Sequence, residues 1–156
     1  MKTLKSHTIV VTFAAILGPR STFDGTRTGF EDSIPAGDKI TTIRENYEYW
    51  ANRIDRAQKH PDSICSHRMW SGKARRSLQY EINQVPAQDL WYASINFKKM
   101  SDEILLINDQ EFPLDLVARN DGLGSPIFRD WFRSFENTDK PCIIIGWTSN
   151  PYLNHD

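Results

Sequence analysis

The sequence has little of what marks several large classes of protein. Its 156 residues include only two cysteines, which are too few for a disulfide framework. Basic and acidic residues number 19 and 20 and nearly cancel, which excludes binding of nucleic acid by bulk charge alone. The longest apolar run, residues 8–17, is too short to span a bilayer. We therefore expect one domain over residues 1–156, with no membrane partner.

The apolar run at residues 8–17 allows two interpretations. Lys2 and Lys5 precede it, as in a secretory signal, but no small-x-small cleavage site follows. Its β-branched residues also favour a buried first strand. We expect the strand. Because the low cysteine count favours a reducing compartment, we also expect a cytoplasmic protein.

The rest of the chain combines strand-like segments with short amphipathic helices. Expected strands lie at residues 39–44, 63–70, 77–85, 90–97, 103–107 and 142–147, and expected helices lie at 46–60, at 114–119 and from 125. Residues 18–38 have no periodic apolar pattern and predict a long loop, and residues 149–156 predict a frayed tail. Strands and long helices do not alternate regularly, so we expect an α+β, mostly β fold. The arrangement that fits is a small antiparallel barrel with two to three short helices at its openings.

Common catalytic and metal-binding patterns are missing. The chain has no Gly-x-Ser-x-Gly elbow, no phosphate-binding P-loop and no Cys-x-x-Cys pair. Cys65 and His67 lie two apart, which is ordinary in a strand and lacks supporting histidine spacing. Gly122 and Gly124 precede a helix, where they could accompany anion binding but more simply punctuate the chain. We expect neither a metal nor another cofactor.

Charge is distributed unevenly along the chain. Residues 53–76 carry seven basic and two acidic side chains, whereas residues 102–121 carry six acidic and one basic. Trp70 lies beside the basic residues at the tip of the expected hairpin, which are Lys73, Arg75 and Arg76. An aromatic ring next to positive charge suits stacking and phosphate neutralisation on a single strand. A solvated turn with a buried tryptophan is the alternative, and the residues alone do not decide.

Lys39 and Thr42 form a second candidate constellation. In a regular strand they would point to opposite faces, but at a strand end they can meet. A desolvated lysine with a lowered pKa can act as a base toward a threonine hydroxyl. A nearby carboxylate would complete an acid/base set. The alternative is that Lys39 is a plain surface charge.

Residues 36–44, Ala-Gly-Asp-Lys-Ile-Thr-Thr-Ile-Arg, resemble the signature of the ASCH domain family, a branch of the PUA-like fold. The family motif runs Gly, one residue, Lys, two residues, Thr, Ile, Arg. Residues 116–123, followed by Phe128 and residues 131–132, are similar to the family's acidic-Gly-hydrophobic segment that opens a helix. The first strand and the basic hairpin come in the expected order. Together these segments cover about half of the chain.

The resemblance implies a PUA-like barrel with a cleft that holds Lys39, Thr42 and Arg44 beside a downstream acid. Family members are thought to bind RNA or modified nucleosides. One branch, the small bacterial acetylcytidine amidohydrolases, uses a lysine, a threonine three residues later and a downstream glutamate. Lys39 and Thr42 match that set, and the acid corresponds best to Asp121, with Glu81 as a second candidate.

Three departures separate this chain from those minimal enzymes. Asp121 is shorter than glutamate, and residues 18–38 and 86–100 are additions. We therefore expect a domain that binds RNA or a nucleotide, with ligand contacts from Arg44, Trp70, Lys73, Arg75 and Arg76. The alternative is an amidohydrolase that deacylates an N-acylated pyrimidine nucleoside, with Lys39 as base and Thr42 as nucleophile.

Overall fold

The computed structural model describes residues 7–15, 17, 23, 25–72, 77–98, 100–137 and 141–153. The strands are β1 (Thr8–Phe13), β2 (Thr41–Arg44), β3 (Ile64–Trp70), β4 (Gln79–Pro86), β5 (Trp91–Asn96), β6 (Ile104–Ile107), β7 (Gln110–Pro113) and β8 (Cys142–Gly146). The helices are α1 (Phe30–Ala36), α2 (Tyr47–Gln58), α3 (Leu114–Asn120) and α4 (Ser125–Phe132), with 3-10 turns at Ala87–Asp89 and Arg133–Asn137. The fold is α+β and mostly β, as predicted.

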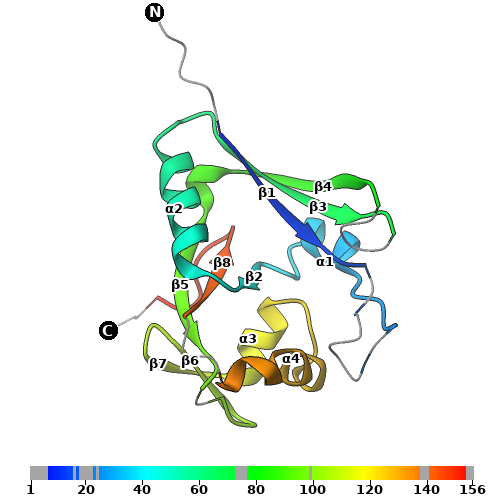
Figure 1. Ribbon diagram of the computed structural model, residues 1–156, viewed down its shortest axis with the longest axis vertical. Coiled ribbons are helices and arrows are strands. Elements are labelled where there is room, and N and C mark those ends of the chain that lie inside the picture. The colour runs from blue at the N-terminus through cyan, green and yellow to red at the C-terminus, as the bar shows by residue number, and fades with distance from the viewer. Residues whose placement is uncertain are drawn as a thin grey trace, which may run out of the picture.

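The strands within these ranges form two sheets and no closed barrel (Figure 1). One sheet has the order β1-β3-β4 and the other the order β2-β8-β5-β6-β7. All pairings are antiparallel except that of β1 with β3, which is parallel. The expected hairpin of residues 63–70 and 77–85 is present as β3 and β4. No helix in the described part of the chain is long and apolar enough to cross a membrane.

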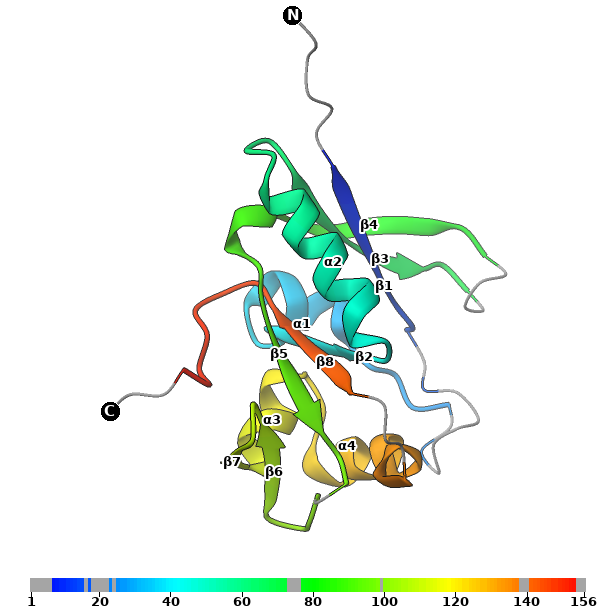
Figure 2. The ribbon, with the colours of Figure 1, turned by 60° about the vertical axis from the view of Figure 1, so that its left-hand side comes forward.

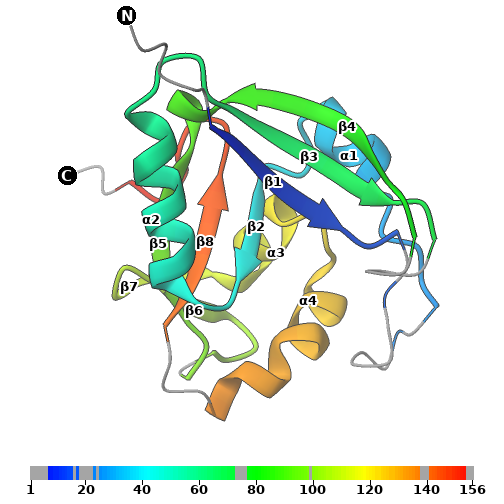
Figure 3. The same cartoon turned by 45° about the horizontal axis from the view of Figure 1, so that its top comes forward.

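Strand β8 separates two hydrophobic cores. Ile143 and Ile145 belong to the core that packs against β1, β3 and α2, whereas Cys142 and Ile144 belong to the core under α3 and α4. This division follows from the alternation of side chains along a strand. Figure 3 shows β8 between β2 and β5. Helix α2 lies next to these strands, and α4 lies below them in this view. A strand covered on both faces must be apolar throughout, and all five residues of β8 are buried.

Two predictions about elements need correction, and one strand was not predicted. Residues 30–36 form α1 rather than part of a long loop, and residues 110–113 pair with β6 as the additional strand β7. The tail is packed as far as Tyr152, which is buried and accepts a hydrogen bond from the Asn120 side chain at 2.9 Å. Each of these segments is short, so tertiary contacts outweigh local pattern.

The glycine predicted to end the second-last helix does so. Gly122 follows α3 with φ +80°, and its N–H donates to the carbonyl of Arg119 at 3.0 Å. A Cβ at this position would lie 3.0 Å from the Lys39 Cβ and Cδ. Glycine therefore serves two purposes here, because it adopts the left-handed conformation and lets the Lys39 stem pass.

Candidate functional site

Lys39 enters the protein interior just before β2 begins. Its backbone N–H donates to Ser33 O at 3.0 Å, and the next N–H, of Ile40, donates to Asn120 O at 2.8 Å. The chain is therefore fastened to α1 on one side and to the end of α3 on the other. Because Lys39 lies outside the regular ladder, its side chain can reach the same region as residues of β2, as the sequence predicted.

The Lys39 side chain is only 1% exposed and is held by three acceptors. Its Nζ donates to Thr41 O at 2.7 Å, to Asp121 O at 2.6 Å and to Asp121 Oδ1 at 3.4 Å. The ring centroids of Phe30 and Phe13 lie 4.4 and 5.5 Å from the nitrogen. Burial lowers the pKa of Lys39 to about 8, against the charge of Asp121, which raises it. The amine is therefore mostly protonated at pH 7, and its three N–H groups are all donated.

Asp121 is the carboxylate that meets Lys39. It is buried at the end of α3, and burial raises its pKa while the Lys39 amine opposes that rise. Thr41 Oγ1 also donates to Asp121 Oδ1, at 3.5 Å. Thr41 is thus the threonine bonded to the pair, a role that the sequence did not indicate.

Thr42 faces a cavity of about 170 Å³ between the two sheets. Its walls come from the end of β1, from β2, from α1 and from α4, and they include Phe13, Phe30, Lys39 and Trp131. Thr42 is buried, and its hydroxyl has no hydrogen-bond partner among the described residues. Thr42, Lys39 and Asp121 therefore line one cavity, but no hydrogen bond joins Thr42 to Lys39.

Arg44 closes the side of this cavity. One guanidinium nitrogen, Nη2, donates to Thr12 O at 2.6 Å, and the Arg44 Cζ lies 5.3 Å from the Phe13 ring centroid. Arg44 Nε is buried and has no partner within the described ranges. Burial lowers the pKa of Arg44 to about 10, and the charge of Asp121 opposes that shift. The cavity wall thus includes Thr42 and also Arg44, whose Nε is an unused donor.

The other predicted site residues lie elsewhere. Glu81 is exposed on β4 and accepts a hydrogen bond from Ser66 at 2.5 Å, so it is not beside Lys39. Trp70 is half-buried at the end of β3 and pairs with Gln79. The remaining predicted contacts, Lys73, Arg75 and Arg76, lie outside the described residues.

His67, which the sequence offered only as a weak metal ligand, is buried near the site. His67 packs against Trp147 with ring centroids 4.3 Å apart and the ring planes tilted by 51°, and its Nδ1 lies 3.1 Å from the Asn83 amide nitrogen. Burial, reinforced by the charges of Lys39 and Arg44, lowers the pKa of His67 to about 4. Its neighbour Cys65 is buried, and burial raises the pKa of that thiol to about 12. No cluster of three metal-ligating side chains occurs in the part of the chain that the structure describes.

No family model matches the chain, and comparisons with curated proteins and with solved structures also return no match.

Proposed function

We propose that this protein binds RNA or a nucleotide, with one pyrimidine base inserted into the cavity that Thr42 and Arg44 line. The observation that carries the proposal is the unpartnered Nε of Arg44, a residue that lines the cavity together with Thr42. A buried N–H without a partner costs about 1–3 kcal/mol. A ligand that brings acceptor oxygens into the cavity recovers that cost, and the carbonyl oxygens of a pyrimidine are acceptors of this kind.

The size and walls of the cavity support a single ring. A volume of about 170 Å³ is close to that of engineered apolar cavities of roughly 150 Å³, which hold one benzene-sized molecule. The rings of Phe13, Phe30 and Trp131 line it, and aromatic side chains stack on bases. A PUA-like relationship to the ASCH domain family, from the motif at residues 37–44, is part of this proposal.

Isothermal titration with cytidine, uridine and their 5′-monophosphates tests the proposal. Thr42→Val keeps the shape of the side chain and removes the hydroxyl, so we expect about a tenfold loss of affinity, equivalent to about 1.4 kcal/mol. Thr148→Val is the matched control, because Thr148 is exposed and lies outside the cavity lining. The proposal is wrong if the wild-type protein binds none of these compounds, or if Thr42→Val and Thr148→Val bind them equally.

A second function, deacylation of an N-acylated pyrimidine nucleoside, rests on the lowered pKa of Lys39 beside Thr42. A neutral Lys39 would take the Thr42 proton as Oγ1 attacks the acyl carbonyl carbon. The C–N bond then breaks, the proton passes to the leaving nitrogen, and water hydrolyses the threonine ester to release the acid. The three hydrogen bonds of Nζ favour binding over this reaction, because an ammonium whose protons are all donated has no lone pair to offer.

The two functions differ in their response to pH. Hydrolysis would need the neutral amine, so the release of cytidine from acetylcytidine should increase with pH and level off above about 8. It should be lost in Thr42→Ala and in Lys39→Ala. Equal rates in these variants and the wild-type protein would exclude the hydrolase.

A further inference from the structure

A second, wider cavity adjoins the cavity at Lys39. This middle cavity has a volume of about 370 Å³ and shares four lining residues with the first: Ile43, Arg44, Trp131 and Phe132. Its outer lining adds Trp50 from α2 and Phe135. Arg44 therefore lies on the wall that the two cavities share.

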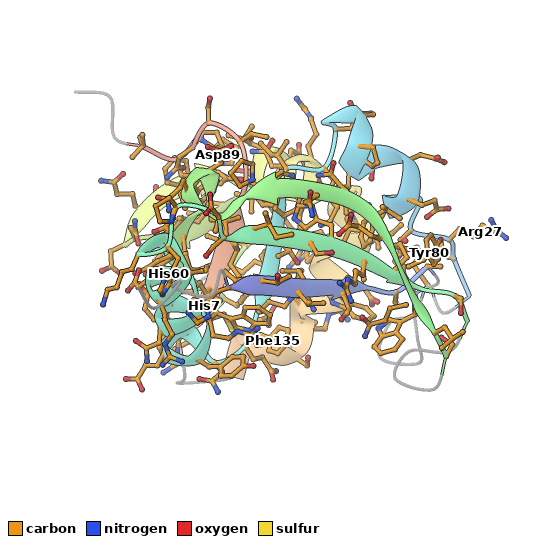
Figure 4. The ribbon with its side chains drawn as sticks, turned by 90° about the horizontal axis from the view of Figure 1, so that it is seen from above. His7, Arg27, His60, Tyr80, Asp89 and Phe135 are labelled. Atoms are coloured by element: carbon orange, nitrogen blue, oxygen red, sulfur yellow. The ribbon has the colours of Figure 1, made fainter. Side chains whose placement is uncertain are left out.

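A third cavity of about 340 Å³ lies along the next part of α2. Its lining comprises His7, Thr8, Ile9, Tyr49, Arg53 and Arg56. Tyr49, Arg53 and Arg56 share one face of the helix, because they are four and three residues apart. Figure 4 shows His7 beside His60 on this side of the molecule, with ring centroids 4.4 Å apart. Neither arginine forms an ion pair with a described residue.

Side chains in contact lie between the middle cavity and the third. The Tyr49 and Trp50 rings meet edge to face at 5.5 Å, and the Arg53 guanidinium lies 5.3 and 5.7 Å from their centroids. Arg53 also donates to the Tyr49 hydroxyl at 2.5 Å. Trp50 lines the middle cavity, and Tyr49 lines the third. Aromatic rings and arginines thus alternate from Arg44, at the end of β2, to Arg56 on α2. Figure 2 shows the course of α2.

We propose that the three cavities form one track for single-stranded RNA, so that the ligand of the proposed function is an oligonucleotide rather than a free nucleoside. The inference rests on that function: one base occupies the first cavity, and the following nucleotides run past Trp50 to Arg53 and Arg56. Rings that accept stacked bases next to arginines that neutralise phosphates are the combination that binds single strands without reading their sequence. A free nucleoside would leave the arginine-lined third cavity unused.

Acidic side chains restrict where phosphates lie on the track. Glu45 lines the middle cavity, whereas no acidic residue lines the third. On α2, the Asp55 carboxylate accepts hydrogen bonds from the Tyr92 hydroxyl at 2.9 and 3.0 Å. Phosphates are therefore expected at Arg53 and Arg56, while the middle cavity takes a base.

Binding of cytidine 5′-monophosphate and of fluorescein-labelled oligouridylates two, four and eight nucleotides long tests the track. For single strands, each phosphate contact changes the slope of log affinity against log salt by about 0.7. At 0.1 M salt this corresponds to roughly a fivefold change in affinity. We expect Arg56→Gln to weaken binding of the eight-nucleotide RNA roughly fivefold, and Arg53→Gln with Arg56→Gln roughly 25-fold. Their salt slopes should fall by about 0.7 and 1.4. Arg119→Gln, which removes one exposed charge on α3, should change neither quantity.

The monophosphate separates this inference from the proposed function. Unchanged affinity of the double variant for the monophosphate shows that the first cavity is intact, so its loss of RNA binding supports the track. Equal affinity of the wild-type protein for the monophosphate and for all three RNAs overturns the track and leaves the first cavity standing. Equal effects of Arg56→Gln and Arg119→Gln overturn it as well. Absence of binding to every probe overturns both proposals.

Discussion

At the scale of single residues, the Lys39–Asp121 pair organises the site without being a source of net stability. Bringing two charges out of water costs several kcal/mol per ion, and their attraction repays this only with good geometry and further hydrogen bonds. The pair has these, since Lys39 Nζ also reaches two carbonyls and Thr41 bonds to the carboxylate. Its consequence is positional: α3, β2 and the segment before β2 are held at one point beside the cavity.

Breaking the pair from one side should therefore be expensive. Lys39→Met leaves Asp121 buried without its cation, and we expect the free energy of unfolding to fall by about 3–5 kcal/mol. Lys39→Met with Asp121→Asn should recover part of the loss, because no carboxylate is then buried alone. Urea unfolding measures both. The control is Lys59→Met, which removes an exposed lysine, and a loss for Lys39→Met no larger than the control's would contradict the buried pair.

His67 makes the stability of the protein depend on pH. Its pKa is about 4 in the folded protein against 6.5 for an ordinary histidine, so the unfolded chain binds more protons in this window. Stability is therefore lost as pH falls from 6.5 toward 4, by about 3 kcal/mol at pH 4. Urea midpoints of the wild-type protein and of His67→Gln, measured from pH 7 to pH 4, isolate this contribution. If both proteins lose stability in parallel, the histidine is not buried as a neutral side chain.

The sequence predicted part of the residue-scale site. Lys39, Thr42 and Asp121 do line one cavity, because the glycine at 122 and the strand start at 41 bring them to one place. Glu81 was the second candidate from the sequence, and the pairing of β4 with β3 puts it elsewhere. Two features of the site could not be predicted: the hydrogen bond from Thr41 to Asp121 and the unused Nε of Arg44. Both depend on the direction of side chains in three dimensions, which no spacing rule supplies.

At the scale of elements, segments with strong periodicity were predicted well, whereas the partners of most strands could not be predicted. Helix α2 and the β3–β4 hairpin were expected nearly as they are, since each carries its own pattern and its own end signals. Helix α1 has only seven residues and contains Pro35, so the sequence predicted a loop there. The parallel pairing of β1 with β3 joins segments about fifty residues apart, and such contacts depend on the whole core.

One close contact between strands is open to a direct test. Gly146 in β8 pairs with Trp91 in β5, and a Cβ on Gly146 would lie 2.1 Å from the Trp91 ring. We expect Gly146→Ala to cost about 1–3 kcal/mol through overpacking, and Gly146→Ala with Trp91→Leu to regain part of it. Gly72→Ala is the matched control, because its Cβ would meet only Ser77, at an ordinary 3.5 Å. Thermal unfolding compares the variants, and equal midpoints for the two alanine variants would contradict the packing of Trp91.

At the scale of the whole molecule, β8 couples the two cores. Its side chains alternate between them, so neither core is complete without this one strand. The candidate cavity depends on the same coupling, because β1 belongs to one sheet and β2, paired to β8, belongs to the other. Trp147 packs in the first core and Trp131 against the second, which gives each core its own fluorescent probe.

We expect the two cores to unfold in one transition. Ile143→Val trims the first core and Ile144→Val the second, and each should cost about 0.5–1.5 kcal/mol. Both residues are fully buried neighbours in β8, so each serves as the control for the other. In variants that keep either Trp147 or Trp131 as the only tryptophan, urea unfolding should show the same midpoint at both probes, and each valine substitution should move both equally. If Ile144→Val moves only the Trp131 transition, the cores unfold separately, and a ligand between the sheets would then stabilise the parts unequally.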